Sequence, residues 1–122
     1  MSETTLSRKD DPYLLCEKQC RELCKYLNVI TLNMPRYEKH ILSAKMRDCG
    51  YSMLELAVCV RLKVHKKTDF TKFSVQKELL KNLLQLSYDC GHIDLKKFRT
   101  ANNILTGVGK RLSPFLSASE VG

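Results

Sequence analysis

The feature that most constrains the fold is a run of apolar residues with helical spacing between positions 36 and 67. Its members are four or three residues apart, which stacks side chains along one face of a helix. They are Leu42, Met46, Cys49, Met53, Leu56 and Val60. The spacing predicts one long helix from Arg36 to Lys67. At about 1.5 Å per residue, such a helix would span roughly 48 Å and set the length of the molecule.

The opposite side of this helix carries a second apolar stripe. Its members project away from the first run at about 100° per residue. They are Tyr51, Leu54, Val58 and Leu62. A helix that is apolar on two sides needs a second partner. We interpret this stripe as the interface of a homo-oligomer, and a neighbouring helix of the same bundle is the alternative partner.

Three further apolar seams with the same spacing predict three more helices. They extend from Pro12 to Leu32, from about Thr68 to Cys90, and from Asp94 to about Leu116. Pro35 separates the first two helices, because proline disfavours helical geometry in the residue before it. Gly91 supplies the left-handed residue that ends the third helix. No stretch alternates between apolar and polar residues as a strand would.

Four helices with short connections predict an all-α domain, an up-down-up-down four-helix bundle at residues 12–116. We expect residues 1–11 to form a disordered leader and residues 117–122 a flexible tail. In this topology the second and fourth helices lie diagonally and run parallel.

The net charge of +8 is unevenly distributed along the chain. Residues 36–67 hold eight basic against three acidic side chains, residues 92–122 hold five against two, and the other segments are neutral. The excess therefore lies on the second and fourth helices. A basic surface without a base-reading motif is typical of contacts with nucleic-acid phosphates. A charged, solvated face would give the same composition.

The candidate nucleic-acid-binding residues are arginines and lysines of these two segments. They are Arg36, Lys39, Arg47, Arg61, Lys96, Arg99, Lys110 and Arg111. Those of the second helix lie on or beside the flank between its two stripes. On the fourth helix, Lys96, Arg99 and Lys110 project opposite the apolar seam.

The sequence predicts neither catalysis nor a cofactor. A Ser, His and Asp set, paired carboxylates and a phosphate-cradling glycine loop are all missing. Cys16, Cys20 and Cys24 follow one another at spacings of four, but the close Cys-x-x-Cys pair of a zinc site is lacking, so we interpret the cysteines as reduced core thiols. A signal peptide and a run of about eighteen apolar residues are also lacking, which predicts a soluble cytoplasmic protein with no membrane partner.

Two motifs resemble those of a family of small bacterial four-helix-bundle proteins. In the first, a helix-breaking proline and a basic residue open a long helix that then carries an arginine and a serine. Its residues are Met34, Pro35, Arg36, Tyr37, Glu38, Leu42, Met46, Arg47, Ser52, Met53, Leu56 and Ala57. The second motif closes the fourth helix with an apolar residue, a glycine, a basic pair and a leucine. Its residues are Ile104, Leu105, Val108, Gly109, Lys110, Arg111 and Leu112.

This family includes proteins encoded by intervening sequences of ribosomal RNA genes and the accessory variability determinants of diversity-generating retroelements. The chain is more similar to the second group, because residues 56–59 read Leu-Ala-Val-Cys where the first group commonly has an Asn-Ile-Ala-Glu-Gly type ending. Its strongly basic composition agrees with this. The resemblance covers roughly residues 23–116.

The resemblance implies a non-catalytic homopentameric barrel that binds the element's reverse transcriptase and RNA or DNA, supporting mutagenic reverse transcription. By matching position, it assigns Arg36, Arg47, Lys110 and Arg111 as family-like basic residues. The alternative function is that of a structural or protein-interaction oligomer of the ribosomal-intervening type, without nucleic-acid binding.

Overall fold

The computed structural model describes residues 11–62 and 65–112, with the backbone alone at Glu38 and Lys39. Within these ranges the chain is helical and contains no strand. The helices are α2 (Pro12–Thr31), α3 (Arg36–Lys39), α4 (Leu42–Leu62), α5 (Lys66–Asp89) and α6 (Leu95–Gly107). The predicted leader up to residue 10, the end of the predicted domain at 113–116 and the predicted tail at 117–122 lie outside the described residues.

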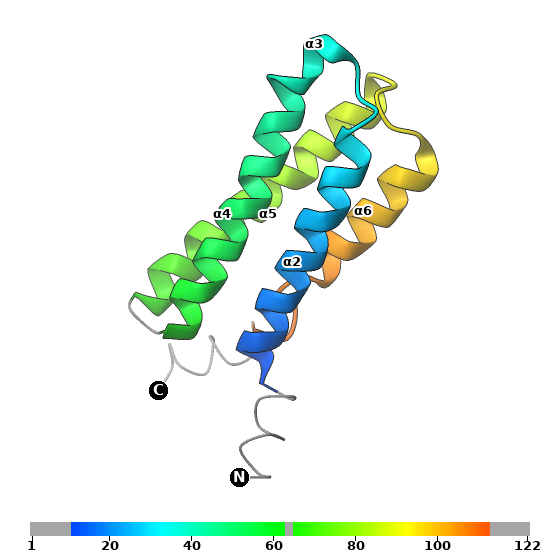
Figure 1. The fold of residues 1–122 in the computed structure, drawn as a ribbon. Helices are drawn as coiled ribbons and strands as arrows, with labels where there is room; N and C mark the ends of the chain where they lie inside the picture. The colour runs from blue at the N-terminus through cyan, green and yellow to red at the C-terminus, as the bar shows by residue number, and fades with distance from the viewer. Residues whose placement is uncertain (1–10, 63–64, 113–122) are drawn as a thin grey trace.

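The four long helices form an antiparallel bundle (Figure 1). α4 packs against α2 and α5, and α6 packs against the same two helices. α4 and α6 are therefore diagonal to each other and run in the same direction. The predicted all-α four-helix bundle is confirmed.

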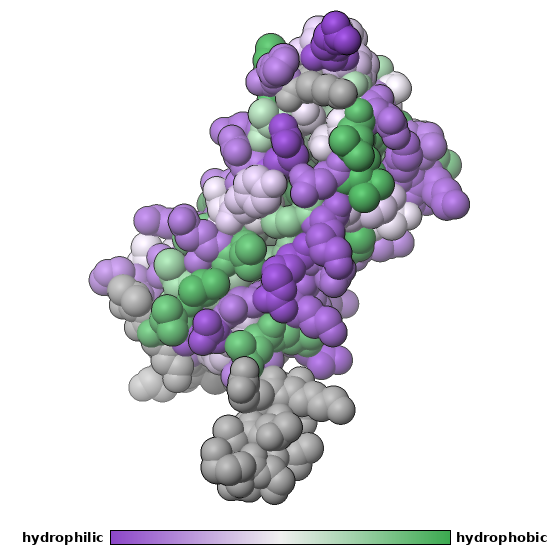
Figure 2. Space-filling model, viewed as in Figure 1, coloured by the Kyte–Doolittle hydropathy of each residue, from purple (hydrophilic) through white to green (hydrophobic). Residues whose placement is uncertain are grey.

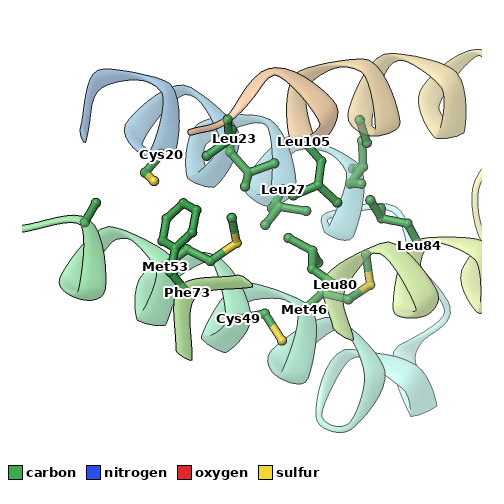
Figure 3. Close-up of a cluster of buried hydrophobic side chains, with 14 of the residues drawn as sticks. Cys20, Leu23, Leu27, Met46, Cys49, Met53, Phe73, Leu80, Leu84 and Leu105 are labelled. Carbon is green, nitrogen blue, oxygen red and sulfur yellow. The ribbon is translucent and has the colours of Figure 1, made fainter. Parts of the chain in front are cut away.

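The core is rich in leucine and in sulfur-containing side chains (Figure 3). Leu23 and Leu27 of α2, Met53 of α4, Leu84 of α5 and Leu105 of α6 are all almost completely buried. Burying each such side chain stabilises the fold by about 1.5–3 kcal/mol. The apolar seams predicted from spacing therefore point into one common core.

Gly50 allows α2 and α4 to approach each other closely. A Cβ atom at this position would lie 2.9 Å from Leu27 Cδ1 and 3.2 Å from Cys24 Sγ. Both distances are shorter than the separation at which carbon atoms attract most strongly. The small residue in the middle of α4 thus sets the spacing of the α2–α4 pair.

The single long helix predicted from Arg36 to Lys67 is wrong at both ends. At its start, a turn at His40 and Ile41 separates α3 from α4. Tyr37 is 69% exposed and Ile41 72%, so little apolar burial holds this segment in line with α4. Burial begins at Leu42, and tertiary packing supplies most of the stability of a protein helix.

At its other end, α5 begins at Lys66, inside the predicted second helix. His65 is the N-cap residue, without a capping hydrogen bond from its side chain. Thr68, the predicted start of the third helix, lies in the first turn of α5. Lys66 Nζ lies 5.1 Å from the centroid of the Tyr13 ring. This cation–π contact ties the start of α5 to α2.

α6 ends at Gly107, well before the predicted end near Leu116. Val108 has an extended backbone, and Gly109 has a φ of 71°, a left-handed conformation that glycine adopts without steric cost. Gly109 therefore belongs to a turn and not to the helix, whereas Gly107 is the last residue of α6. The apolar seam continues through this turn, because Val108 and Leu112 are buried.

Several smaller predictions concern caps and burial. The side chains of Asp11 and Asp94 accept backbone N–H groups at the starts of α2 and α6. Gly91, as predicted, is left-handed with a φ of 76°. Leu86 of α5 is 48% exposed. Every helix among the described residues is too short or too polar to span a membrane.

Candidate nucleic-acid interface

The predicted basic residues near the start of the second helix have different environments. Arg36 in α3 is exposed, whereas Arg47 in α4 is half-buried. Arg47 Nε donates to the carbonyl oxygen of Ser43, 3.4 Å away. The Lys39 side chain lies outside the described residues. The Arg36 side chain is therefore accessible to a phosphate group, whereas Arg47 is partly held by a hydrogen bond within its own helix.

Arg47 also lines a groove between the C-terminal part of α2 and the N-terminal part of α4. This groove has a volume of about 470 Å³, and its other lining residues are Asn28, Val29, Thr31, Leu32, Ser43 and Tyr51. Val29 is 53% exposed, Leu32 69% and Tyr51 49%. The guanidinium group thus lies beside exposed apolar surface, which suits contact with a protein better than contact with phosphate alone.

Arg61 is held in an ion pair. Its Nε donates to the carboxylate of Glu17 in α2, and the side chains are 35% and 10% exposed, respectively. A phosphate group would have to compete with this largely buried carboxylate. The arrangement favours a role for Arg61 in joining α4 to α2.

The predicted basic residues of the fourth helix are more accessible. Lys96 and Arg99 are exposed on α6, and Lys110 and Arg111 are exposed in the turn that follows it. The next residue, Leu112, is only 1% exposed. The turn therefore presents two adjacent cations outward while the chain returns to the core.

This turn is fixed by hydrogen bonds from two neighbouring helices. Lys77 Nζ of α5 donates to the carbonyl oxygen of Val108 at 2.8 Å, and the Gly109 N–H donates to Gln19 Oε1 of α2 at 3.1 Å. A Cβ atom on Gly109 would lie 3.0 Å from Phe73 Cε1. Both the left-handed backbone and the nearby ring therefore require glycine in the Gly-basic-basic-Leu motif.

The structure does not bring the eight predicted basic residues into one patch. They lie on α3, α4, α6 and the turn after α6, and α4 and α6 are diagonal helices. The N-terminal ends of α4 and α6 share one end of the bundle, and their C-terminal ends share the other (Figure 1). Within one protomer, the charge predicted to bind nucleic acid is therefore divided between opposite edges.

Sequence reasoning missed Lys77 and Lys81 of α5. Their segment has no net charge, so the count of charges by segment gave no reason to select them. Both line a groove between α5 and α6. A helical projection of α5 could have found them, because residues four apart lie on one face.

The apolar stripe predicted as an oligomer interface is partly open. Tyr51 is 49% exposed and Leu62 59%, while Leu54 and Val58 are half-buried and Leu54 packs against the core. Figure 2 shows apolar surface along the C-terminal half of α4 and near the C-terminal end of α2. Neighbouring helices of the same chain thus leave part of the stripe uncovered.

All six cysteines are free thiols, and four of them are buried. A hydrogen bond between Cys16 and Cys20 lowers the pKa of the Cys16 thiol, whereas this bond and burial raise the pKa of Cys20. Among the residues that the structure describes, no three His, Cys, Asp or Glu side chains converge as metal ligands.

A model of the bAvd-like family matches residues 14–118, which include the core, the α2–α4 groove and the turn after α6. The chain belongs to the bAvd-like family. The resemblance to accessory variability determinants is therefore confirmed, and this bAvd-like chain is an Avd-type protein. A search of curated proteins finds no match.

Proposed function

We propose that this bAvd-like protein is a non-catalytic accessory protein of a diversity-generating retroelement. It acts in the cytoplasm, binds the element's reverse transcriptase and RNA or DNA, and supports mutagenic reverse transcription. The observation that carries the proposal is the family match over residues 14–118. The net charge of +8 supports it, because a basic surface attracts polyanions.

The exposed basic side chains are suited to contact phosphates. Arg36, Lys96, Arg99, Lys110 and Arg111 are all exposed, and no DNA-reading motif accompanies them. Such side chains neutralise phosphates and release counterions, which gives affinity with little sequence preference. We therefore infer binding to RNA or DNA that weakens steeply as salt increases.

We further propose that the protein assembles as a homopentameric barrel. The exposed parts of the stripe, Tyr51 and Leu62, support a contact between subunits. Assembly would also change how the basic residues are grouped, because α4 and α6 lie on opposite edges of each protomer. A ring of protomers would bring the α4 edge of one copy toward the α6 edge of the next.

The test of nucleic-acid binding is fluorescence anisotropy with a labelled single-stranded RNA and its DNA equivalent. The measurement compares wild type with Arg36→Gln/Lys96→Gln/Arg99→Gln over a range of salt concentrations. Each lost phosphate contact should lower the slope of log affinity against log salt by about 0.7 for a single strand. An unchanged slope would show that these side chains do not contact phosphate.

Binding to a partner protein is tested by asking whether this chain co-purifies with the reverse transcriptase of the same element. The α2–α4 groove, with Arg47 beside exposed Val29 and Leu32, favours a protein contact there. The same groove favours the second candidate function, a protein-interaction oligomer without nucleic-acid binding. Binding confined to one protein partner, with no shift of any oligonucleotide, would select that second function.

A further inference from the structure

We propose that the groove between α5 and α6 binds the phosphodiester backbone of a nucleic-acid strand. The inference rests on the proposed nucleic-acid binding and assigns it to a surface that the charge excess of α4 does not indicate. The groove has a volume of about 220 Å³, and its lining residues are Lys77, Glu78, Lys81, Asn102, Leu105 and Thr106.

The groove is lined by Lys77 and Lys81, and the ammonium group of Lys110 lies near that of Lys77. Lys77 and Lys81 are one helical turn apart on the same face of α5. Burial lowers the pKa of Lys77, the neighbouring Cys16 and Glu78 oppose this shift, and Lys110 adds a smaller lowering. Among the residues that the structure describes, Glu78 is the one acidic residue that lines the groove. A phosphate bound here would accept charge-assisted hydrogen bonds from the lysines.

Lys77 is already held in position for such a contact. Its Nζ donates to the Val108 carbonyl oxygen at 2.8 Å, and an ammonium group has three N–H donors. Two donors remain for a ligand. Because the side chain is ordered before binding, the entropy cost of the contact is reduced. Asn102, half-buried on α6, adds an amide that can donate to a phosphate oxygen.

The size and surroundings of the groove favour a polymer over a small metabolite. Pockets that enclose small molecules usually have about 300–1,000 Å³, more than the 220 Å³ found here. The basic surface also continues past the groove. Arg99 precedes Asn102 by one helical turn on α6, and Lys110 follows the other end of that helix. A strand lying along α6 would meet these cations in succession.

The experiment compares two double variants of the full chain that remove the same charge. Lys81→Gln/Lys110→Gln alters one exposed residue that lines the groove and one in the turn beside it. Lys45→Gln/Lys72→Gln alters exposed residues of α4 and α5 outside the groove. Anisotropy with a single-stranded RNA oligonucleotide is measured across salt concentrations, and circular dichroism confirms folding. Losing two phosphate contacts should lower the salt slope by about 1.4 for the groove variant. Lys81→Arg should retain wild-type binding.

A lower slope and a several-fold weaker affinity in the groove variant alone would support the proposal. Equal losses in both variants would indicate diffuse attraction and overturn the groove site while leaving nucleic-acid binding intact. Wild-type affinity in both variants would also overturn it. If wild type binds no RNA but inorganic phosphate shifts the amide resonances of Asn102 and Thr106, the groove takes free phosphate, and both the groove proposal and the proposed function fail.

Discussion

Two of the grooves of this bundle differ in the chemistry of their walls, although both lie between antiparallel helices. The α2–α4 groove places Val29, Leu32 and Tyr51 at the surface around a single arginine. The α5–α6 groove instead carries Lys77 and Lys81 beside polar residues of α6. The α2–α4 groove is suited to contact another protein, and the α5–α6 groove is suited to contact phosphate groups. The two surfaces lie on different helix pairs and share no lining residue.

The largest expected effect comes from placing charge on the open part of the α4 stripe. Tyr51→Glu/Leu62→Glu should reduce the particle from an oligomer to the 14.1 kDa chain, because an unpaired carboxylate is costly to bury in an apolar interface. Light scattering measures the mass, and retained helicity in circular dichroism shows folding. Val75→Glu, also at an exposed apolar residue, is the control. An unchanged mass in the stripe variant would show that the stripe is not an interface.

The next effect concerns the turn that presents the basic pair after α6. Gly109→Ala should lower the free energy of unfolding by about 2–4 kcal/mol, from the left-handed backbone and from crowding against Phe73. Gly107→Ala is the matched control, since its added Cβ would meet no atom of a neighbouring helix within 4 Å. Urea denaturation measures both variants. Equal stability of the two would contradict the role given to Gly109.

A smaller effect distinguishes an arginine that stabilises the fold from the arginines proposed to bind nucleic acid. Arg61→Met should lower the free energy of unfolding by about 1–2 kcal/mol, because it leaves the Glu17 carboxylate largely buried without its partner. Its affinity for RNA should stay near that of wild type. Urea denaturation measures the stability of the variant, and anisotropy measures its affinity for RNA. A large loss of affinity with unchanged stability would show that Arg61 binds RNA instead of stabilising the fold.

The smallest effect distinguishes the buried thiols of α2 and α4 from the surface thiol. Cys90 is exposed, whereas Cys24 and Cys49 are buried, and burial raises the pKa of the Cys24 and Cys49 thiols. A thiolate-directed reagent should modify Cys90 first, because only the thiolate reacts. Mass spectrometry after brief labelling identifies the sites. Early modification of Cys24 would show that α2 and α4 separate readily.

The sequence was sufficient to predict helices and core because both depend on apolar spacing, as at Leu23, Leu27 and Met53. It was insufficient where tertiary contacts determine where a helix begins or ends. The break at Ile41 follows from missing burial. The end of α6 follows from Gly109, whose N–H donates to Gln19, and from Val108, whose carbonyl oxygen accepts from Lys77. Counting charge by segment could not reveal that Lys81 lies across from Asn102, because that depends on how α5 and α6 pack.

The most direct test of the whole account is light scattering of the purified protein, with and without a mixed RNA and DNA oligonucleotide pool at low salt. A pentamer that binds nucleic acid would have five times the 14.1 kDa chain mass, co-elute with the oligonucleotides and release them as salt is raised. A 14.1 kDa particle that elutes apart from the oligonucleotides at every salt concentration would contradict the account.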